Sequence, residues 1–380
     1  MIDHNQTALL ELLKASLFGG EPRLPADIDW DAVFAEAKSH AVEALAAPCV
    51  PPEEAPRWRE AADRSAAYYL QLAFYQRELV RLFENAGIPL VILKGTAAAV
   101  YYPEPSRRTM GDIDFLVPLD RFDEAKRLMM DSGYTLEKDI TPDSRHAVLI
   151  RYGVEFELHL RFGGRLWPSI EAGLQHVETA TVSGVQFPIL PTMENGLVLF
   201  GHVRQHLLDT NSSLGLRQMI DWMLYVHANA GDPEWERGFM DLMRQYELET
   251  PAATVTAVCK TYLGLPDDLP WPADAQATEK LFDRIMSSGN FGSKKNRDET
   301  VVQDKLLTIR RMGTFKYLQT AGLANWKAAQ RCRILRPLAW LYQLFRYAWK
   351  VLVGLLKGEK LGKGLAAGKE EDDFNRSIGL

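Results

Sequence analysis

The chain has 380 residues, of which 47% are hydrophobic, and a formal net charge of −6. This length accommodates two or three domains, and the apolar content suffices for a sizeable core. The acidic balance argues against a general nucleic-acid-binding protein, which is usually basic overall. Three cysteines without a C-x-x-C pair argue against a disulfide framework and a cysteine-based zinc site. The N-terminal residues lack the pattern of a signal peptide, so we expect a reducing, cytoplasmic location.

The pattern of apolar residues divides the chain into four segments. Residues 1–88 show helical spacing, and residues 191–330 return to it. Between them, residues 89–190 form the predicted α/β core. Its five predicted strands are "PLVILKG", "DIDFLV", "YTLEKD", "HAVLIRYG" and "VEFELHLRF". The predicted fold class is therefore α+β, with a small mixed β-sheet core flanked by N-terminal and C-terminal helical segments.

Residues 331–380 are predicted to form a basic amphipathic helix and an acidic tail. Within residues 335–356, a narrow polar stripe faces a wide apolar surface; the stripe consists of Gln343, Arg346 and Lys350 and continues to Lys357. The flanking basic residues are Arg331, Arg333, Arg336, Lys360, Lys363 and Lys369. Charges inside the run argue against a membrane-spanning helix. Two alternatives remain: peripheral contact at the inner membrane face, or docking on the protein's own core or a partner.

The motif "MGDIDFLV" places two carboxylates, Asp112 and Asp114, on one face of a predicted strand. Such a pair repels and loses water, and a divalent cation is the usual remedy. Mg²⁺ prefers oxygen ligands and leaves sites open for substrate phosphates; Mn²⁺ is a second candidate. Glu157 is the predicted third carboxylate, with Glu155 as its rival and His159 on the same face. Two ions can then serve the attacking oxygen and a triphosphate with its pyrophosphate leaving group. The alternative is a chance D-x-D whose aspartates cap a turn.

Four residues upstream of or beside this pair are candidates for phosphate binding. Lys94, Gly95 and Thr96 lie where a predicted strand turns into a helix, where glycine permits close approach of a phosphate. Lys94 and Arg108 supply positive charge. The alternatives are a solvated strand end for Lys94, and an internal ion pair of Arg108 with Asp112 or Asp114.

The stretches "LKGTAAAVYY", "RRTMGDIDFLV" and "FELHLRF" resemble the uncharacterised nucleotidyltransferase family of the DNA polymerase β-type superfamily. The similarity covers roughly residues 30–230. It includes a His-rich helix followed by an Arg-x-x-x-Asp helix, and these positions match His202, His206, Arg217 and Asp221. The chain differs from the superfamily in having Gly95-Thr96 for the usual Gly-Ser, a longer gap to Asp112, and glutamate as third acid. The resemblance implies transfer of a nucleotide from an NTP such as ATP, with no particular acceptor.

Two further pairs lie one helical turn apart. His202 and His206 share a helix face, a spacing that can bind zinc, but no third ligand lies nearby in the sequence. Packing against the active-site block is therefore favoured. Arg217 and Asp221 are most simply an intrahelical ion pair, with a site role as the alternative. His40 and His146 are interpreted as ordinary residues.

The sequence favours a metal-dependent enzyme in which Asp112 and Asp114 hold two metal ions, and Glu157 completes the metal site and helps to deprotonate the acceptor. Its ligands would be an NTP and an unidentified acceptor, and no general nucleic-acid binding is expected. The alternative is a catalytically inactive binding or regulatory protein on the same fold. If residues 335–356 contact a membrane, the acceptor would be located there.

Overall fold

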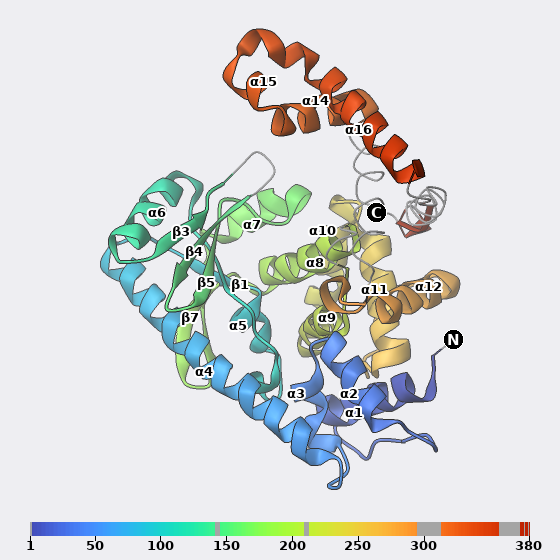
Figure 1. Cartoon of the computed structure of the whole chain (residues 1–380). Coiled ribbons are helices and arrows are strands. Elements are labelled where there is room, and N and C mark those ends of the chain that lie inside the picture. The colour runs from blue at the N-terminus through green and yellow to red at the C-terminus, as the bar shows by residue number, and fades with distance from the viewer. Residues whose placement is uncertain are drawn as a thin grey trace. The chain divides into compact units, whose positions relative to one another are not determined.

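The computed structural model describes residues 2–140, 145–208, 213–294, 313–356, 373–375, 377–378 and 380 (Figure 1). The chain divides into two compact units. The larger unit includes residues 2–208 and 213–294, and the smaller unit includes residues 313–356. Most of the predicted acidic tail lies outside the described residues, and so do Lys357, Lys360, Lys363 and Lys369.

The N-terminal segment is helical, as predicted. It contains α1 (His4–Phe18), α2 (Trp30–Ser39), α3 (Glu43–Ala46) and the long α4 (Ala55–Asn85). Asp3 caps α1 by accepting a hydrogen bond from the Gln6 backbone N–H, and Asp29 caps α2. These caps satisfy N–H groups that have no partner within their own helices.

The core is a five-stranded mixed sheet in the order β1-β2-β5-β4-β3. The strands are β1 (Val91–Leu93), β2 (Ile113–Leu116), β3 (Thr135–Lys138), β4 (His146–Arg151) and β5 (Val154–His159). Only the β2–β5 pair is parallel; the other three neighbouring pairs are antiparallel. The predicted mixed sheet and α+β class are therefore confirmed.

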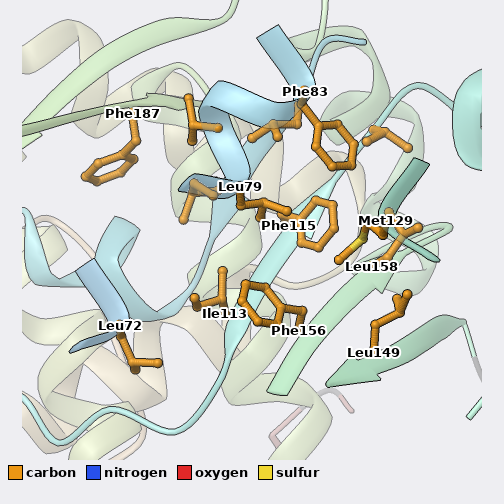
Figure 2. Packing of buried hydrophobic residues seen from close by; sticks show 14 of the residues in the cluster. Leu72, Leu79, Phe83, Ile113, Phe115, Met129, Leu149, Phe156, Leu158 and Phe187 are labelled. Carbon is orange, nitrogen blue, oxygen red and sulfur yellow. The ribbon is translucent and has the colours of Figure 1, made fainter. Parts of the chain in front are cut away.

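One face of this sheet is apolar and is covered by helices α4 and α6 (Phe122–Asp131). Figure 2 shows Leu79 and Phe83 of α4 beside Phe115 of β2. The Phe83 and Phe115 rings meet edge to face, with centroids 5.5 Å apart. Because side chains alternate across a strand, burial of Ile113 and Phe115 on this face directs Asp114 to the opposite face.

The core also contains a two-stranded hairpin that the sequence pattern did not indicate. Strands β6 (Glu178–Val182) and β7 (Val185–Ile189) pair antiparallel around Ser183-Gly184. Both turn residues have positive φ, the conformation of the tightest hairpin turns. The short helices α5 (Gly95–Ala99) and α7 (Trp167–Gly173) complete the core.

The rest of the larger unit is helical, as predicted: α8 (Thr192–Leu208), α9 (Leu216–Asn229), α10 (Pro233–Gln245), α11 (Glu249–Leu263) and α12 (Ala275–Ser288). Within the smaller unit lie α14 (Thr314–Asn325), α15 (Lys327–Arg331) and α16 (Ala339–Leu356). Among the described residues, no helix is both long enough and apolar enough to cross a membrane.

Candidate functional site

Three carboxylates converge on the polar face of the sheet. Asp114 of β2 is the register partner of Glu157 of β5, and Asp112 directly precedes β2. One oxygen from each carboxylate lies within 4.8 Å of the other two. The parallel pairing of β2 with β5 therefore brings together residues that are more than forty positions apart in the sequence. Glu155, the rival third acid, is exposed and lies outside this group.

Two basic side chains approach the carboxylates. The Lys94 ammonium lies 2.6 Å from Asp114 Oδ1 and 3.8 Å from Glu157 Oε2. The Nε2 of His159 lies 2.8 Å from the same Asp114 oxygen and 3.3 Å from Glu157 Oε2. Asp114 and His159 are both buried, so these contacts are shielded from water. Both basic groups thus contact Asp114 and Glu157.

The carboxylates are unequally stabilised. The charge of Asp114, together with burial, raises the pKa of Asp112 above its usual value. Burial alone would raise the pKa of Glu157 as well. However, the hydrogen bond from His159 and the charge of Lys94 lower it to about 2. The protein therefore stabilises the ionised form of Asp112 less than that of Glu157.

Lys94 reaches the cluster from a strained backbone position. Its φ of 44° and ψ of −128° lie outside the regions that non-glycine residues favour. Burial opposes its charge, but the nearby Asp114, Glu157 and Asp112 raise the pKa of the ammonium. The ammonium also lies 5.3 Å from the centre of the Phe162 ring. The strain is consistent with a residue whose position is set by its contacts.

The cluster fits a hard divalent cation. The donors are carboxylate oxygens, the ligand type that Mg²⁺ prefers. The Lys94 ammonium already occupies a cation position beside Asp114, and the raised pKa of Asp112 indicates that more positive charge would be accommodated. Asp112, Asp114 and Glu157 are thus able to hold such an ion.

Comparison with known proteins identifies the family of this chain. The sequence profile of a family described as "Uncharacterised nucleotidyltransferase" matches residues 26–264. The chain belongs to this family. No curated protein matches the chain. Among solved structures, it is similar to an antigenic nucleotidyltransferase-like protein from Paracoccidioides brasiliensis. The two sequences share 15% identity, the alignment covers 48% of this chain and 91% of that one, and the TM-score is 0.29.

In this nucleotidyltransferase-family protein, two predicted phosphate-binding residues contact other parts of the core. Gly95 begins α5, and a Cβ built there would lie 3.6 Å from the Asp112 carbonyl oxygen. Residue 95 therefore lies beside the backbone of Asp112, and a Cβ there would make an ordinary van der Waals contact. The buried Thr96 hydroxyl hydrogen-bonds to the Gln76 side chain of α4. Gly95 is therefore adjacent to the cluster, whereas the Thr96 hydroxyl points to α4.

Arg108 forms an internal ion pair, but with a different partner from the two considered in the sequence. Its Nε and Nη2 each lie 2.7 Å from an oxygen of Asp221 on α9. Both side chains are buried, and the Tyr102 hydroxyl donates a third hydrogen bond to Asp221. Arg217 is not the partner of Asp221, as an intrahelical pair would require; it donates to the Thr109 carbonyl oxygen. The loop before Asp112 is thereby attached to α9 at two points.

His202 and His206 contact each other on α8. Their Nε2 atoms lie 2.9 Å apart, so one imidazole donates and the other accepts. Burial, with the charges of His206 and Lys94, lowers the pKa of His202 well below its usual value. Among the residues that the structure describes, neither histidine belongs to a group of three side chains with metal-binding geometry.

His146, interpreted from the sequence as an ordinary residue, lies beside the site. Its Nε2 is 3.5 Å from Glu157 Oε1, and burial lowers its pKa. With Glu157 and His159 it forms a second group of ligand atoms within 4.8 Å. The signal was present in the sequence: a two-residue turn at Tyr152-Gly153 makes His146 the register partner of His159.

Proposed function

We propose that this protein transfers a nucleoside monophosphate from an NTP to an acceptor, with release of pyrophosphate and with dependence on Mg²⁺. Family membership supports nucleotidyl transfer as the general activity. The observation that carries the finer proposal is the convergence of Asp112, Asp114 and Glu157 at the β2–β5 pair. Two ions are expected, as in other two-metal sites, and Mn²⁺ is the alternative metal.

The three carboxylates would hold the metal, and Lys94 would contribute the nearest fixed positive charge. Bound Mg²⁺ supplies neutralisation of triphosphate charge and Lewis-acid activation of oxygen. Lys94 is held at the cluster by Asp114 and Glu157, so it is placed to contact an anion that enters beside them. Gly95 follows it without a side chain, which leaves room next to the Asp112 carbonyl.

The acidities of the side chains favour particular roles. A carboxylate with a pKa of about 2, such as Glu157, is a weak proton acceptor at neutral pH, and this favours a ligand role. His146 has a lowered pKa and is only partly buried, so a neutral imidazole is available 3.5 Å from Glu157. A neutral imidazole is a better base than Glu157 for removing the proton from the acceptor substrate.

The second candidate is a nucleotide-binding or regulatory protein without turnover. The observation that favours it is that several predicted phosphate ligands already have protein partners. Lys94 contacts Asp114, Thr96 contacts Gln76, and Arg108 contacts Asp221. Such a protein would bind an NTP and release no pyrophosphate.

Calorimetric titration of the four NTPs, with and without Mg²⁺, tests the binding half of the proposal. The wild type is compared with the Asp112→Asn/Asp114→Asn double variant and with Asp131→Asn, a control that changes an exposed aspartate at the end of α6. We expect Mg²⁺-dependent binding in the wild type and in the control. The double variant should lose it while keeping the far-ultraviolet circular dichroism of the fold.

Pyrophosphate release, measured across a panel of sugar, peptide and RNA acceptors, then separates the two candidates. Release by the wild type that the double variant lacks supports transfer. Mg²⁺-dependent binding with no release for any acceptor favours the regulatory protein. Binding that survives in the double variant would contradict the metal site itself.

A further inference from the structure

Within the smaller unit, the segment of residues 313–356 differs in charge from the chain as a whole. Residues 313–356 contain seven basic residues and no aspartate or glutamate. The whole chain, in contrast, has a net charge of −6. The basic residues are Lys316, Lys327, Arg331, Arg333, Arg336, Arg346 and Lys350. A segment with basic and no acidic residues, in a protein that is acidic overall, attracts an anionic partner.

The two long helices of this unit pack through small and polar residues. α14 and α16 lie side by side (Figure 1). At Gly322 a Cβ would clash with the backbone of Ala339, so only glycine permits this close approach. Gln343 is 2% exposed and accepts a hydrogen bond from Asn325. The polar stripe predicted for α16 therefore begins, at Gln343, on the side that faces α14.

Several large apolar side chains of this unit are exposed to solvent. Phe345 is 73% exposed and Trp349 is 68% exposed, and the two lie one helical turn apart on α16. Ile334, just before α16, is 84% exposed. Leu338, Leu344 and Phe315 are also exposed. Monomeric proteins rarely leave such a set of large apolar residues in water without a partner.

We propose that this aromatic and basic surface binds the headgroup region of an anionic phospholipid bilayer. Trp and Phe on one helix face, with Lys and Arg around them, are typical of helices that lie in the membrane interface. The aromatic rings would enter the acyl boundary, and the basic side chains would contact lipid phosphates. The proposal does not depend on the proposed nucleotidyl transfer.

Charge selects this occupant among the alternatives. A second copy of the same surface would bring seven positive charges against seven more, with no acidic residue in 313–356 to pair them. The apolar residues alone would suit many protein surfaces. Exposed apolar residues together with basic residues and no acidic ones fit an anionic bilayer, which is apolar inside and negatively charged at its surface.

Flotation of the full-length protein with lipid vesicles tests the proposal. Vesicles of phosphatidylcholine alone are compared with vesicles that also contain phosphatidylglycerol, at low and high salt. We expect binding that requires phosphatidylglycerol and weakens with salt. The Phe345→Ser/Trp349→Ser variant should reduce partitioning at least about tenfold, since each ring buries apolar surface in the bilayer.

Two further variants make the test specific. Leu70→Ser/Phe74→Ser alters two exposed apolar residues of α4 in the larger unit, and it should bind as the wild type does. Lys316→Gln/Lys327→Gln/Arg333→Gln removes three exposed charges and should reduce partitioning at least about tenfold at low salt. Circular dichroism confirms that each variant is folded.

Three outcomes would overturn the proposal. The first is absence of flotation with anionic vesicles. The second is equal flotation of the wild type and the Phe345→Ser/Trp349→Ser variant. The third is equal binding to neutral and anionic vesicles at low salt, which would indicate a purely apolar contact. A protein that forms stoichiometric oligomers through this surface, and does not float, would show that the occupant is another polypeptide.

Discussion

Two buried charged clusters in the larger unit illustrate opposite uses of charge. The Arg108–Asp221 pair matches one cation with one anion in two parallel hydrogen bonds, and Tyr102 adds a third. The carboxylate cluster instead gathers three acids around Lys94 and His159. The first cluster is complete with protein groups alone. In the second, the charge of Asp114 and burial raise the pKa of Asp112, so nearby positive groups only partly compensate its ionised form.

The difference separates structural charge from charge that awaits a ligand. A completed buried pair is costly to break but needs nothing from outside. A site with excess negative charge is costly to maintain and becomes favourable when a cation arrives. Arg108 and Asp112 are only four residues apart in the chain, yet they belong to different categories.

The largest effect is expected from breaking the structural pair. Arg108→Met leaves the buried Asp221 carboxylate without its bidentate partner. We expect the free energy of unfolding, measured by urea denaturation, to fall by about 3–5 kcal/mol. Asp221→Leu should show a similar loss, because it leaves the buried Arg108 guanidinium without its carboxylate partner.

The double variant Arg108→Met/Asp221→Leu is the control. Replacing both charges with apolar groups removes the unpaired charge, so we expect most of the lost stability to return. Additive losses in the double variant would show that the two residues are not coupled. A stable single variant that loses nucleotide binding would instead indicate a direct role for Arg108 at the site.

Glu157 should behave as the stabilised member of the carboxylate cluster. Its pKa is lowered from 4.5 to about 2, so it contributes stability that is fully present above pH 4.5. This contribution is lost as the pH falls through about 2, because protonation then removes the charge that His159 and Lys94 stabilise. Glu157→Gln should therefore cost about 3 kcal/mol at pH 7 without metal.

Urea denaturation at several pH values checks this prediction. The difference in unfolding free energy between the wild type and Glu157→Gln should shrink between pH 4.5 and the acid limit of the fold. A matched variant, Glu155→Gln, alters the exposed acid of the same strand and should change stability by less than about 0.5 kcal/mol. A constant difference at all pH values would contradict the assigned pKa.

Local patterns in the sequence were sufficient for the five strands of the mixed sheet and for the face on which Asp114 lies. Alternation placed Ile113 and Phe115 on the apolar face and directed Asp114 to the other, as the structure shows. These local patterns did not determine the partner of Arg108, because Asp221 lies 113 residues away on a helix whose position depends on tertiary packing. The same reason hid the contact between Thr96 and Gln76.

Orientation of α16 was also beyond the sequence pattern. The periodicity separated a polar stripe from an apolar face, but either side can contact a neighbouring helix. The close crossing at Gly322 makes room for the side of α16 that carries Gln343, and this leaves Phe345 and Trp349 exposed. The β6–β7 hairpin was missed although Ser183-Gly184 is a turn signal, since its strands alternate weakly.

A moderate effect is expected at Thr96, where structural and ligand roles can be separated. Thr96→Val removes the buried hydrogen bond to Gln76 and should cost about 1–2 kcal/mol of unfolding free energy. Thr96→Ser keeps the hydroxyl and should lose less. If Thr96 is structural, NTP affinity measured by calorimetry will be the same in all three proteins. A loss of NTP affinity in Thr96→Val alone would indicate that the Thr96 hydroxyl binds a phosphate.

The smallest effect on stability, and the one with the opposite sign, is expected at Asp112. Because Asp114 and burial raise its pKa, ionised Asp112 destabilises the metal-free fold at neutral pH. Asp112→Asn should therefore raise the free energy of unfolding without metal by up to about 1 kcal/mol. This gain should vanish as the pH falls below 3.8, the usual pKa of an aspartate.

With Mg²⁺ the wild type should instead be the more stable protein, since only the wild type gains the binding energy of the ion. Urea titrations of both proteins, with Mg²⁺ and with a chelator, measure this. A variant that is less stable than the wild type in both conditions would place Asp112 with the structural charges rather than with the metal ligands.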